Sequence, residues 1–458
     1  MNVRKFLVLY VVLVVSVSII FADGSTESSG ESITIQFWTA PNQGQFKFWD
    51  TIIQQFNAAK VKSNGKIIYV KVQQMPEAPS SEAGIQNALA TNSAPTLAEN
   101  INRGFAATLA TSGRVYDIQN TAFYKEIVEA RKLDTVMPGW QINGKQYVIP
   151  LYANAMGYHW NMVALRELGF MDRVPTTLDD INLLIKNFRE LKNTKMKQLG
   201  VGFLFMRPQL MRPEWWWDRW FDFEMQYNAF SQGKTIVTSD TLTMDPAIAK
   251  KVLEFFGAFG DTLQTAEEWN AFEQNVVPVV FQVTAPWDVP KYEAAGKKYG
   301  LDGDYMYGPP IVQKSGDKPY TFADSKGIVF FKGGNITEEE HQAGVVFLSW
   351  VFSKENSAKV DLEWLKTTGM LPVRGDMGTN PVFVEYMKDK PVLAAQSKLI
   401  PYAIPAMANE KMSDILTALG EFAVTPYIIE CKKTGNAVSA DTYVTKAVIA
   451  MKKAGNFK

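Results

Sequence analysis

The chain has 458 residues, and its 47 Lys and Arg residues balance 47 Asp and Glu residues, so its formal charge at neutral pH is zero. There is no basic surplus to indicate nucleic acid as a partner, and the length favours two or three domains over one. Aromatic residues make up 12% of the chain and include 12 Trp, which is more aromatic surface than a core usually requires.

The N-terminus has the order of a secretory signal peptide. Arg4 and Lys5 precede an apolar run over residues 6–21, which the small Ala22 closes. The run is shorter than the ~20 apolar residues of a spanning helix, so we expect a cleaved signal peptide over residues 1–22 rather than a membrane anchor.

The residues after the expected cleavage site indicate the compartment. Residues 23–32 are polar and are expected to form a flexible linker. No Cys stands at the junction, so we expect a protein of the periplasm or cell exterior without a lipid anchor there. Cys431 is the only cysteine, so no internal disulfide can form and the core must hold the fold.

Apolar periodicity then predicts alternating strands and helices. Strands are indicated where apolar and polar residues alternate, and helices where apolar residues recur every three or four positions. Such alternation is typical of a mostly parallel sheet covered by helices. The expected elements are a strand at 33–37, a helix around 49–56, a strand at 67–72, a short helix around 85–89, an extended segment at 95–97 and a helix at 104–112.

Turn and capping residues place further element ends. Asn143 and Gly144 can supply the two positive φ angles of a type I′ turn, which predicts a hairpin over residues 141–150. Two patterns are typical of a helix start: a Thr cap with an acidic residue three positions later, and an Asp cap followed directly by Pro. Three such starts are expected: Thr177 with Asp180, Asp245 with Pro246, and Thr337 with Glu340.

The sequence shows no catalytic or metal-binding constellation. Its two histidines, His159 and His341, stand far apart, and neither has a Cys or His at the spacing of metal ligands. His159 lies in an apolar run and is expected to be a structural histidine with satisfied hydrogen bonds. His341 follows three glutamates and is expected on the solvated surface. We therefore expect no cofactor and no metal.

A pair of carboxylates would suffice for a glycosidase, so the acidic residues need a separate argument. Glu214, Asp218 and Asp222 would share one face of a helix, whereas facing catalytic carboxylates usually come from different elements. We expect a solvated face or pairing with Arg219 instead.

Several motifs resemble those of bacterial extracellular solute-binding proteins of the maltose-binding type. Their order and spacing carry the resemblance, which spans nearly the whole chain after the signal peptide. Two motifs depart from the family pattern: Thr96 stands where the family has Asp, and the usual Gly before Trp287 is missing. The motifs are Asn143-Gly144-Lys145 with Tyr147 and Pro150, Tyr158 to Asn161, Leu168-Gly169-Phe170, Val174 to Asp180, Ala94-Pro95-Thr96, Ala285-Pro286-Trp287, and Thr368 to Arg374.

The resemblance implies an α/β, two-lobed periplasmic-binding-protein-like fold, in which each lobe is a mostly parallel sheet flanked by helices. A hinge of two or three crossings would join a first lobe of residues 33–150 and 321–370 to a second lobe of residues 151–320 and 371–458. It also implies a non-enzymatic monomer that captures a small carbohydrate and docks on the permease subunits of an ABC importer, with no nucleic-acid partner.

Ligands of open α/β sheets bind beyond the carboxyl ends of strands, which selects candidate residues in the loops there. Aromatic planes suit the C–H faces of sugar rings, and Asp, Asn and Arg suit their hydroxyls. The expected ligand contacts are Trp38, Asn42, Asn102, Arg103, Asn154, Trp215, Trp216, Trp287, Asp324 and Arg374. For Asn102, Arg103 and Asn154 the resemblance implies this role, because they match positions at which the family contacts its ligand.

Each candidate also has a structural alternative. Trp38 and Trp287 could pack in the core, Arg103 could form a salt bridge, and Asp324 could serve as a cap or turn residue. On a helix, the Trp215 to Trp217 run with Trp220 spreads around the axis, so one or two of the group are expected in the cleft and the others in the core.

Three other functions stay open at this stage. An anion such as a glycerol phosphate could be bound by four arginines, the protein could be a secreted glycoside-cleaving enzyme, or it could serve a signalling receptor. The four arginines are Arg103, Arg207, Arg212 and Arg374.

Overall fold

The computed structural model describes residues 32–76, 80–134, 136–206, 212–213, 215–238, 240–264, 279–285 and 288–458. The predicted signal peptide and nearly all of the predicted linker lie outside these residues, as do Arg207, Glu214 and Trp287.

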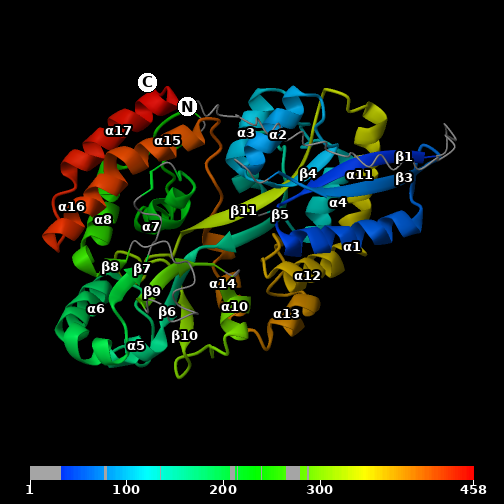
Figure 1. Cartoon of the computed structure of the whole chain (residues 1–458). Helices are drawn as coiled ribbons and strands as arrows, with labels where there is room; N and C mark the ends of the chain where they lie inside the picture. The colour runs from blue at the N-terminus through cyan, green and yellow to red at the C-terminus, as the bar shows by residue number, and fades with distance from the viewer. Residues whose placement is uncertain are drawn as a thin grey trace, which may run out of the picture.

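The described chain forms two α/β lobes, each with its own sheet and hydrophobic core (Figure 1). In the seven-stranded sheet of the first lobe, β1 pairs in parallel with β3 and β4, whereas β11 runs antiparallel to β4 and β5. Its strands are β1 (Ser32–Thr39), β2 (Lys62–Ser63), β3 (Lys66–Gln74), β4 (Leu97–Ile101), β5 (Ile149–Ala155), β11 (Thr321–Phe330) and β12 (Ala403–Ile404).

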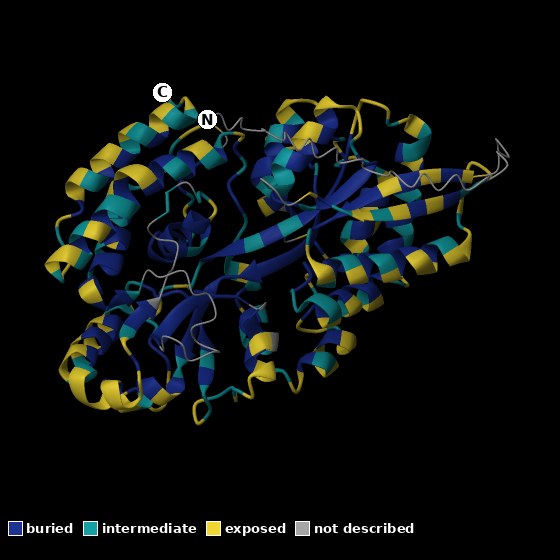
Figure 2. Ribbon diagram, viewed as in Figure 1, coloured by how far each residue is buried: buried dark blue, intermediate teal, exposed yellow. Residues whose placement is uncertain are grey.

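Helices cover this sheet and bury their apolar faces against it (Figure 2). The helix expected around 49–56 is α1, which begins at the Asn42 cap and buries Trp49 and Phe56. The first-lobe helices are α1 (Gln43–Ala59), α2 (Ser81–Ala90), α3 (Arg103–Thr111), α4 (Ala122–Arg131), α11 (Glu338–Val351) and α12 (Ser357–Thr368), with the 3-10 turn η1 (Met137–Trp140).

The second lobe has a five-stranded sheet in which β6 and β9 pair antiparallel, and β7 pairs in parallel with β8 and β9. Its strands are β6 (Gly157–Asn161), β7 (Phe203–Met206), β8 (Leu263–Gln264), β9 (Val279–Thr284) and β10 (Tyr305–Gly308). Its helical segments are α5 (Met162–Glu167), α6 (Leu178–Leu191), η2 (Lys192–Met196), η4 (Trp220–Glu224), α7 (Met225–Phe230), α8 (Pro246–Gly257), η5 (Gly260–Thr262), α15 (Met412–Leu419), η8 (Gly420–Val424), α16 (Thr425–Thr434) and α17 (Asp441–Gly455).

A smaller third core lies where the chain passes between the lobes. It joins residues of β10 to Leu365 and Leu371, which flank the end of α12. The remaining segments are α10 (Val289–Ala294), α13 (Pro381–Met387), α14 (Pro391–Ser397) and η7 (Ile400–Tyr402).

Strands β5 and β11 lie side by side along the connection between the lobes (Figure 1). The chain stays in the first sheet as far as Ala155 and enters the second at Gly157. On β11, Phe322 packs in the second core and Ala323 in the first. These two strands therefore form the floor between the lobes.

The two-lobed α/β prediction is confirmed, with one difference. Both sheets are mixed rather than mostly parallel, because β11 and β5 in one, and β6 in the other, run against their neighbours. Such strands return the chain between the lobes without a helical crossover, which the periodicity of single strands does not reveal. In the part of the chain described above, no helix is both long enough and apolar enough to span a membrane.

Local signals in the sequence were reliable. Asn143 and Gly144 have φ angles of 51° and 72°, and Ile142 and Lys145 exchange backbone hydrogen bonds across them, so the predicted turn is confirmed. The two short strands predicted beside it are reduced to this single bridge, and β5 begins only at Ile149 and pairs with β11 instead. The three predicted helix starts also cap as expected, the first and last as reciprocal capping boxes.

The histidine predictions need correction. His341 is 9% exposed and stacks on Tyr116 at 3.7 Å, so it is not a solvated surface residue. His159 is structural and fully buried among tyrosines, but its ring nitrogens have no hydrogen-bond partner among the described residues. Burial lowers the pKa of His159 to about 3, which keeps it neutral.

Candidate functional site

A cavity of about 480 Å³ lies between the lobes and has one wall from each. The ends of strands and the starts of helices form the first-lobe wall, as expected for an open α/β sheet. Indole and phenyl rings form the opposite wall. The lining residues are Pro41, Ser80, Ser81, Glu82, Ile85, Asn100, Ile101, Asn102 and Phe105 from the first lobe, Trp216, Trp217, Trp220 and Phe221 from the second, and Asp324 and Lys326 from β11.

The floor of the cavity comes from the two connecting strands. Asp324 lies opposite Asn154 in the β11–β5 ladder, and Lys326 lies opposite Tyr152. Residues two apart on a strand share a face, so all four side chains point to the side that lines the cavity. Asp324 and Lys326 are half-buried and offer an acceptor and a donor to a ligand.

Asn154 is fully buried, and its side-chain nitrogen has no hydrogen-bond partner among the described residues. Its oxygen accepts a 3.4 Å hydrogen bond from the backbone nitrogen of Leu371, which fixes the orientation of the amide. A buried donor without a partner is costly, so a water molecule or a ligand oxygen is expected beside it. Asn154 is not itself among the described lining residues of the cavity, so its role as a ligand contact stays a prediction.

Two helix starts supply the polar part of the first-lobe wall. Asn102 caps α3 by accepting a 2.8 Å hydrogen bond from the backbone nitrogen of Phe105, and it donates to Glu82 at 3.1 Å. Ser80 caps α2 in the same manner. Because the caps hold these side chains in place, the wall is preorganised before a ligand arrives.

A second layer of buried polar groups supports this wall. The Tyr152 hydroxyl donates to Asn100 at 3.3 Å, and Tyr152 stacks on Trp364. Glu99 accepts hydrogen bonds from the Thr39 hydroxyl at 2.6 Å and from the backbone nitrogen of Ala40 at 2.9 Å. Burial raises the pKa of Glu99, and the nearby Lys326 opposes that shift.

The tryptophans form a turn and then a short helical segment, not the single helix expected from the sequence. Trp216 and Trp217 lie in a turn, and the irregular helix follows at Trp220. Trp216 packs edge-on against Trp220 at 5.2 Å, and Trp220 stacks on Phe322 at 5.0 Å. Trp217 remains 38% exposed. Trp216, Trp217 and Trp220 all line the cavity, and only Trp220 is buried, so the prediction of one or two tryptophans in the cleft and the others in the core is not met.

Trp215 has a different environment. It stacks on Trp217 at 5.5 Å, and the guanidinium of Arg212 lies 4.3 Å from its ring centroid. Trp215 is not among the described lining residues of the cavity. In this turn, Trp216 and Trp217 rather than Trp215 therefore face the cavity between the lobes.

Three further candidates lie outside the described lining of the cavity. Trp38 is 8% exposed within the first-lobe core, which agrees with its core alternative. Asn42 caps α1. Arg103 donates to the carbonyl of Gln141 at 3.2 Å and forms no salt bridge with another described residue. Burial lowers its pKa to about 10, so it stays charged at neutral pH.

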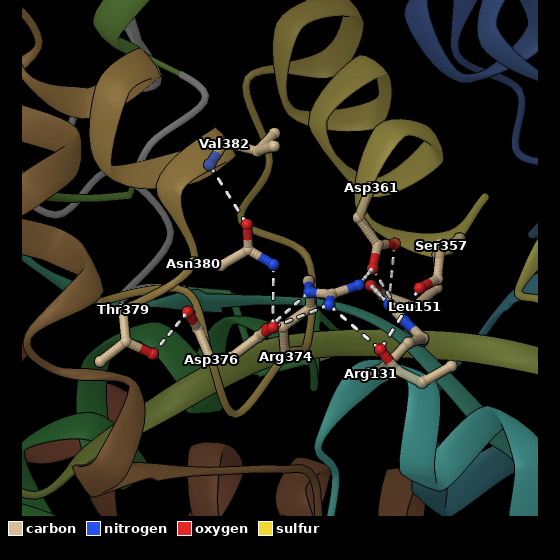
Figure 3. A network of polar contacts seen from close by, with 10 residues as sticks. Arg131, Leu151, Ser357, Asp361, Arg374, Asp376, Thr379, Asn380 and Val382 are labelled. Carbon is tan, nitrogen blue, oxygen red and sulfur yellow. Dashed lines mark hydrogen bonds and ion pairs between the residues drawn. The ribbon is translucent and has the colours of Figure 1, made fainter. Parts of the chain in front are cut away.

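Arg374 belongs to a buried network of ion pairs (Figure 3). It pairs with Asp361 at 3.0 Å and with Asp376 at 2.8 Å, and Arg131 pairs with the same Asp361 at 2.9 Å. Arg131 also donates to the carbonyls of Pro150 and Leu151 on β5. Arg374 thus ties the segment after α12 to the first lobe and is not brought together with the cavity residues.

The charges of the cavity argue against an anionic ligand. Lys326 is the one basic side chain in the described lining, whereas Glu82 and Asp324 are acidic. Of the four arginines proposed for an anion, Arg207 lies outside the described residues and the other three are engaged elsewhere.

The described part of the chain holds no group of three or more His, Cys, Asp or Glu residues that could bind a metal ion.

The acidic stripe considered for a glycosidase is also engaged in structure. Asp218 and Asp222 are buried, and Asp222 pairs with the buried Arg219 at 2.9 Å. For Asp222 the arginine-paired alternative therefore holds, Asp218 is buried rather than solvated, and Glu214 lies outside the described residues.

Sequence reasoning missed several lining residues. Lys326 could have been found from Asp324, because it stands two positions further on the same strand. Asn100 has a φ angle of 67°, a conformation that Asn tolerates better than most residues, but nothing in the sequence marked it. Ser80 caps α2 and Glu82 lies in its first turn, whereas the sequence placed this helix only around 85–89.

Comparisons with known proteins identify the class that this fold and cavity define. Residues 51–392 match the family model of the bacterial extracellular solute-binding proteins, and the chain belongs to this family. Among curated protein sequences, none matches the chain.

Solved structures agree with this assignment. An uncharacterized protein from Listeria monocytogenes EGD-e is 31% identical, with a TM-score of 0.76 over 92% of this chain and 98% of that chain. The cyclic α-maltosyl-1,6-maltose-binding protein of Arthrobacter globiformis is 17% identical, with a TM-score of 0.71 over 92% and 99%. An ABC transporter solute-binding protein from Thermotoga lettingae, bound with α-D-tagatose, is 16% identical, with a TM-score of 0.66 over 92% and 100%.

Proposed function

We propose that this protein is an extracytoplasmic receptor that captures a small carbohydrate between its lobes and delivers it to the permease of an ABC importer. The observation that carries the proposal is the composition of the cavity. Trp216 and Trp217 form an aromatic wall, and Asn102 and Asp324 face it from the other side. Sugars present C–H faces to aromatic rings and hydroxyls to carboxylate and amide groups.

The comparisons support this proposal through the fold. The structures from Arthrobacter globiformis and Thermotoga lettingae share the two-lobed architecture, and their names report a cyclic maltosyl-maltose and α-D-tagatose as ligands. The proposal extends to secretion by the N-terminal signal peptide, a monomeric state, no nucleic-acid partner and no catalytic turnover. Trp287 as a ligand contact also remains part of it, as do the predicted lobe boundaries, except that β5 as far as Ala155 and β12 pair in the first-lobe sheet.

A thermal-shift screen tests the ligand class. A compound that binds only the native state raises the melting temperature, by an amount that grows with its concentration relative to Kd. The panel contains D-tagatose, maltose, maltotriose and maltotetraose, with glycerol 3-phosphate and inorganic phosphate as the anionic arm. We expect a shift from at least one carbohydrate and none from the anions. Shifts from the anions alone would replace the proposal with the glycerol-phosphate alternative.

An activity assay tests the absence of turnover. Chromogenic glycosides incubated with the protein should release no chromophore above the rate of a buffer control. Release that saturates with substrate would identify a glycoside-cleaving enzyme instead.

A further inference from the structure

Helix α3 of the first lobe lies against the segment that leads into α15 of the second lobe. Phe105 and Leu109 on α3 pack in the first-lobe core, whereas Met407 and Met412 pack in the second-lobe core. Gly104 faces these two methionines, at the side of the cleft near Trp216.

Gly104 leaves almost no space between the lobes. A Cβ atom at this position would lie 2.5 Å from Met412 Sδ, 2.7 Å from Met412 Cε and 3.0 Å from the carbonyl oxygen of Met407. One turn further along α3, the Thr108 hydroxyl donates to the carbonyl of Glu410 at 3.4 Å. A side chain at residue 104 would therefore displace the end of Met412 and press on the backbone carbonyl of Met407, both on the second-lobe side of this contact.

The helix itself gives no reason for a glycine here. Gly104 does not have a positive φ angle, so any residue could adopt its backbone conformation. Glycine is also a poorer helix former than alanine. The space between the lobes is thus the feature that requires glycine.

We propose that Gly104 sets how closely the two lobes approach on the α3 side of the cleft, and so determines how tightly the protein holds its solute. The effect on affinity rests on the proposed function, because it assumes that closure of the lobes retains the solute. The lobe contact itself does not depend on which solute is bound. A Gly104→Ala variant should shift the population toward open forms, and the apparent affinity falls in proportion to the closed fraction.

Distances between spin labels test the contact directly. Labels are placed at two exposed positions, Ser112→Cys after α3 and Glu421→Cys in η8, while Cys431 is buried and does not label. We expect Gly104→Ala to remove the shortest distances that the parent protein shows, with or without 10 mM maltotriose. Gly202→Ala is the matched control, because a Cβ there meets no atom within 4 Å.

A second variant separates a specific clash from general damage. Met412→Ala removes the atoms nearest to the added Cβ, so the Gly104→Ala/Met412→Ala double variant should recover the short distances. For a carbohydrate from the panel above that binds, Gly104→Ala should weaken affinity roughly tenfold or more, with an unchanged or higher melting temperature of the free protein. Unchanged label distances in Gly104→Ala would overturn the inference, whether or not any carbohydrate binds. A panel without binders, together with altered distances, would instead overturn the proposed function alone.

Discussion

Asp324 on β11 lies directly opposite Asn154 on β5, and both side chains point to the sheet face that lines the inter-lobe cavity. The two strands that connect the lobes therefore also carry polar groups of the site. A solute bound to Asp324 would contact the connection itself, so we expect binding to be coupled to the angle between the lobes. Only a ligand with different affinities for the open and closed forms can shift that equilibrium.

Replacing Asp324 should weaken carbohydrate binding. Asp324→Asn removes the charge that strengthens a hydrogen bond from a sugar hydroxyl, and such bonds contribute about 1.5–3 kcal/mol. We expect the Kd measured by calorimetry to rise about 10- to 100-fold, with little change in melting temperature. Asp389→Asn, at an exposed surface position, is the control. Equal affinities of the two variants would show that Asp324 does not contact the solute.

The tryptophans should separate into a ligand-binding and a structural group. Trp217→Ala should cost on the order of 2–4 kcal/mol of binding free energy, as for buried aromatic contacts at interfaces. Because Trp217 is 38% exposed in this structure, its loss should leave the free energy of unfolding nearly unchanged. Trp215→Ala, away from the described lining, should bind almost normally. The reverse order of affinities would show that the turn presents Trp215 to the solute.

Arg374 should matter for stability rather than for binding. Removing one partner of a buried ion pair costs about 3–5 kcal/mol, since the other charge stays buried. Arg374→Ala should lower the free energy of unfolding in urea by that order, while the folded fraction retains its affinity. Lys354→Ala serves as a control, because Lys354 pairs with Glu129 in an exposed bridge of 3.8 Å. A stable Arg374→Ala protein without affinity would restore Arg374 as a ligand contact.

Glu224 should make the protein less stable at alkaline pH. Its side chain is buried, and burial raises its pKa from about 4.5 to about 8. Between these values the folded protein holds a proton that the unfolded chain releases. Stability from this group is therefore greatest below pH 4.5 and falls as the pH rises to 8.

The Glu224→Gln variant tests this linkage. It should flatten the pH dependence of the free energy of unfolding, because the parent protein loses on the order of 4 kcal/mol of stability between pH 4.5 and pH 8 through this group and the variant does not. Glu421→Gln, at an exposed position, should leave the pH profile as it is. Identical profiles for the two variants would mean that Glu224 titrates normally.

Turns and helix caps, which depend on residues close together in the sequence, could be predicted. The Asn143-Gly144 turn and the cap at Thr177 depend on residues within a few positions, and the structure confirms both. The mixed strand directions could not be predicted in this way, because pairing partners such as β5 and β11 lie more than 160 residues apart in the chain.

The site was predictable only in part, for the same reason. The surplus of tryptophans indicated an aromatic wall, but a turn rather than a helix decides that Trp217 faces the cavity. Arg374 follows a family-like motif, yet its partner Asp361 could not be identified from spacing alone. Lys326, by contrast, could have been inferred from Asp324, because the two residues share one face of β11.

The most direct test of the central claim is a crystal structure of the protein saturated with a carbohydrate that raises its melting temperature. The account predicts electron density for a sugar ring in the inter-lobe cavity, against Trp216 or Trp217, with a hydroxyl within hydrogen-bond distance of Asp324. Density for the sugar at a surface site, with this cavity holding only water, would contradict it.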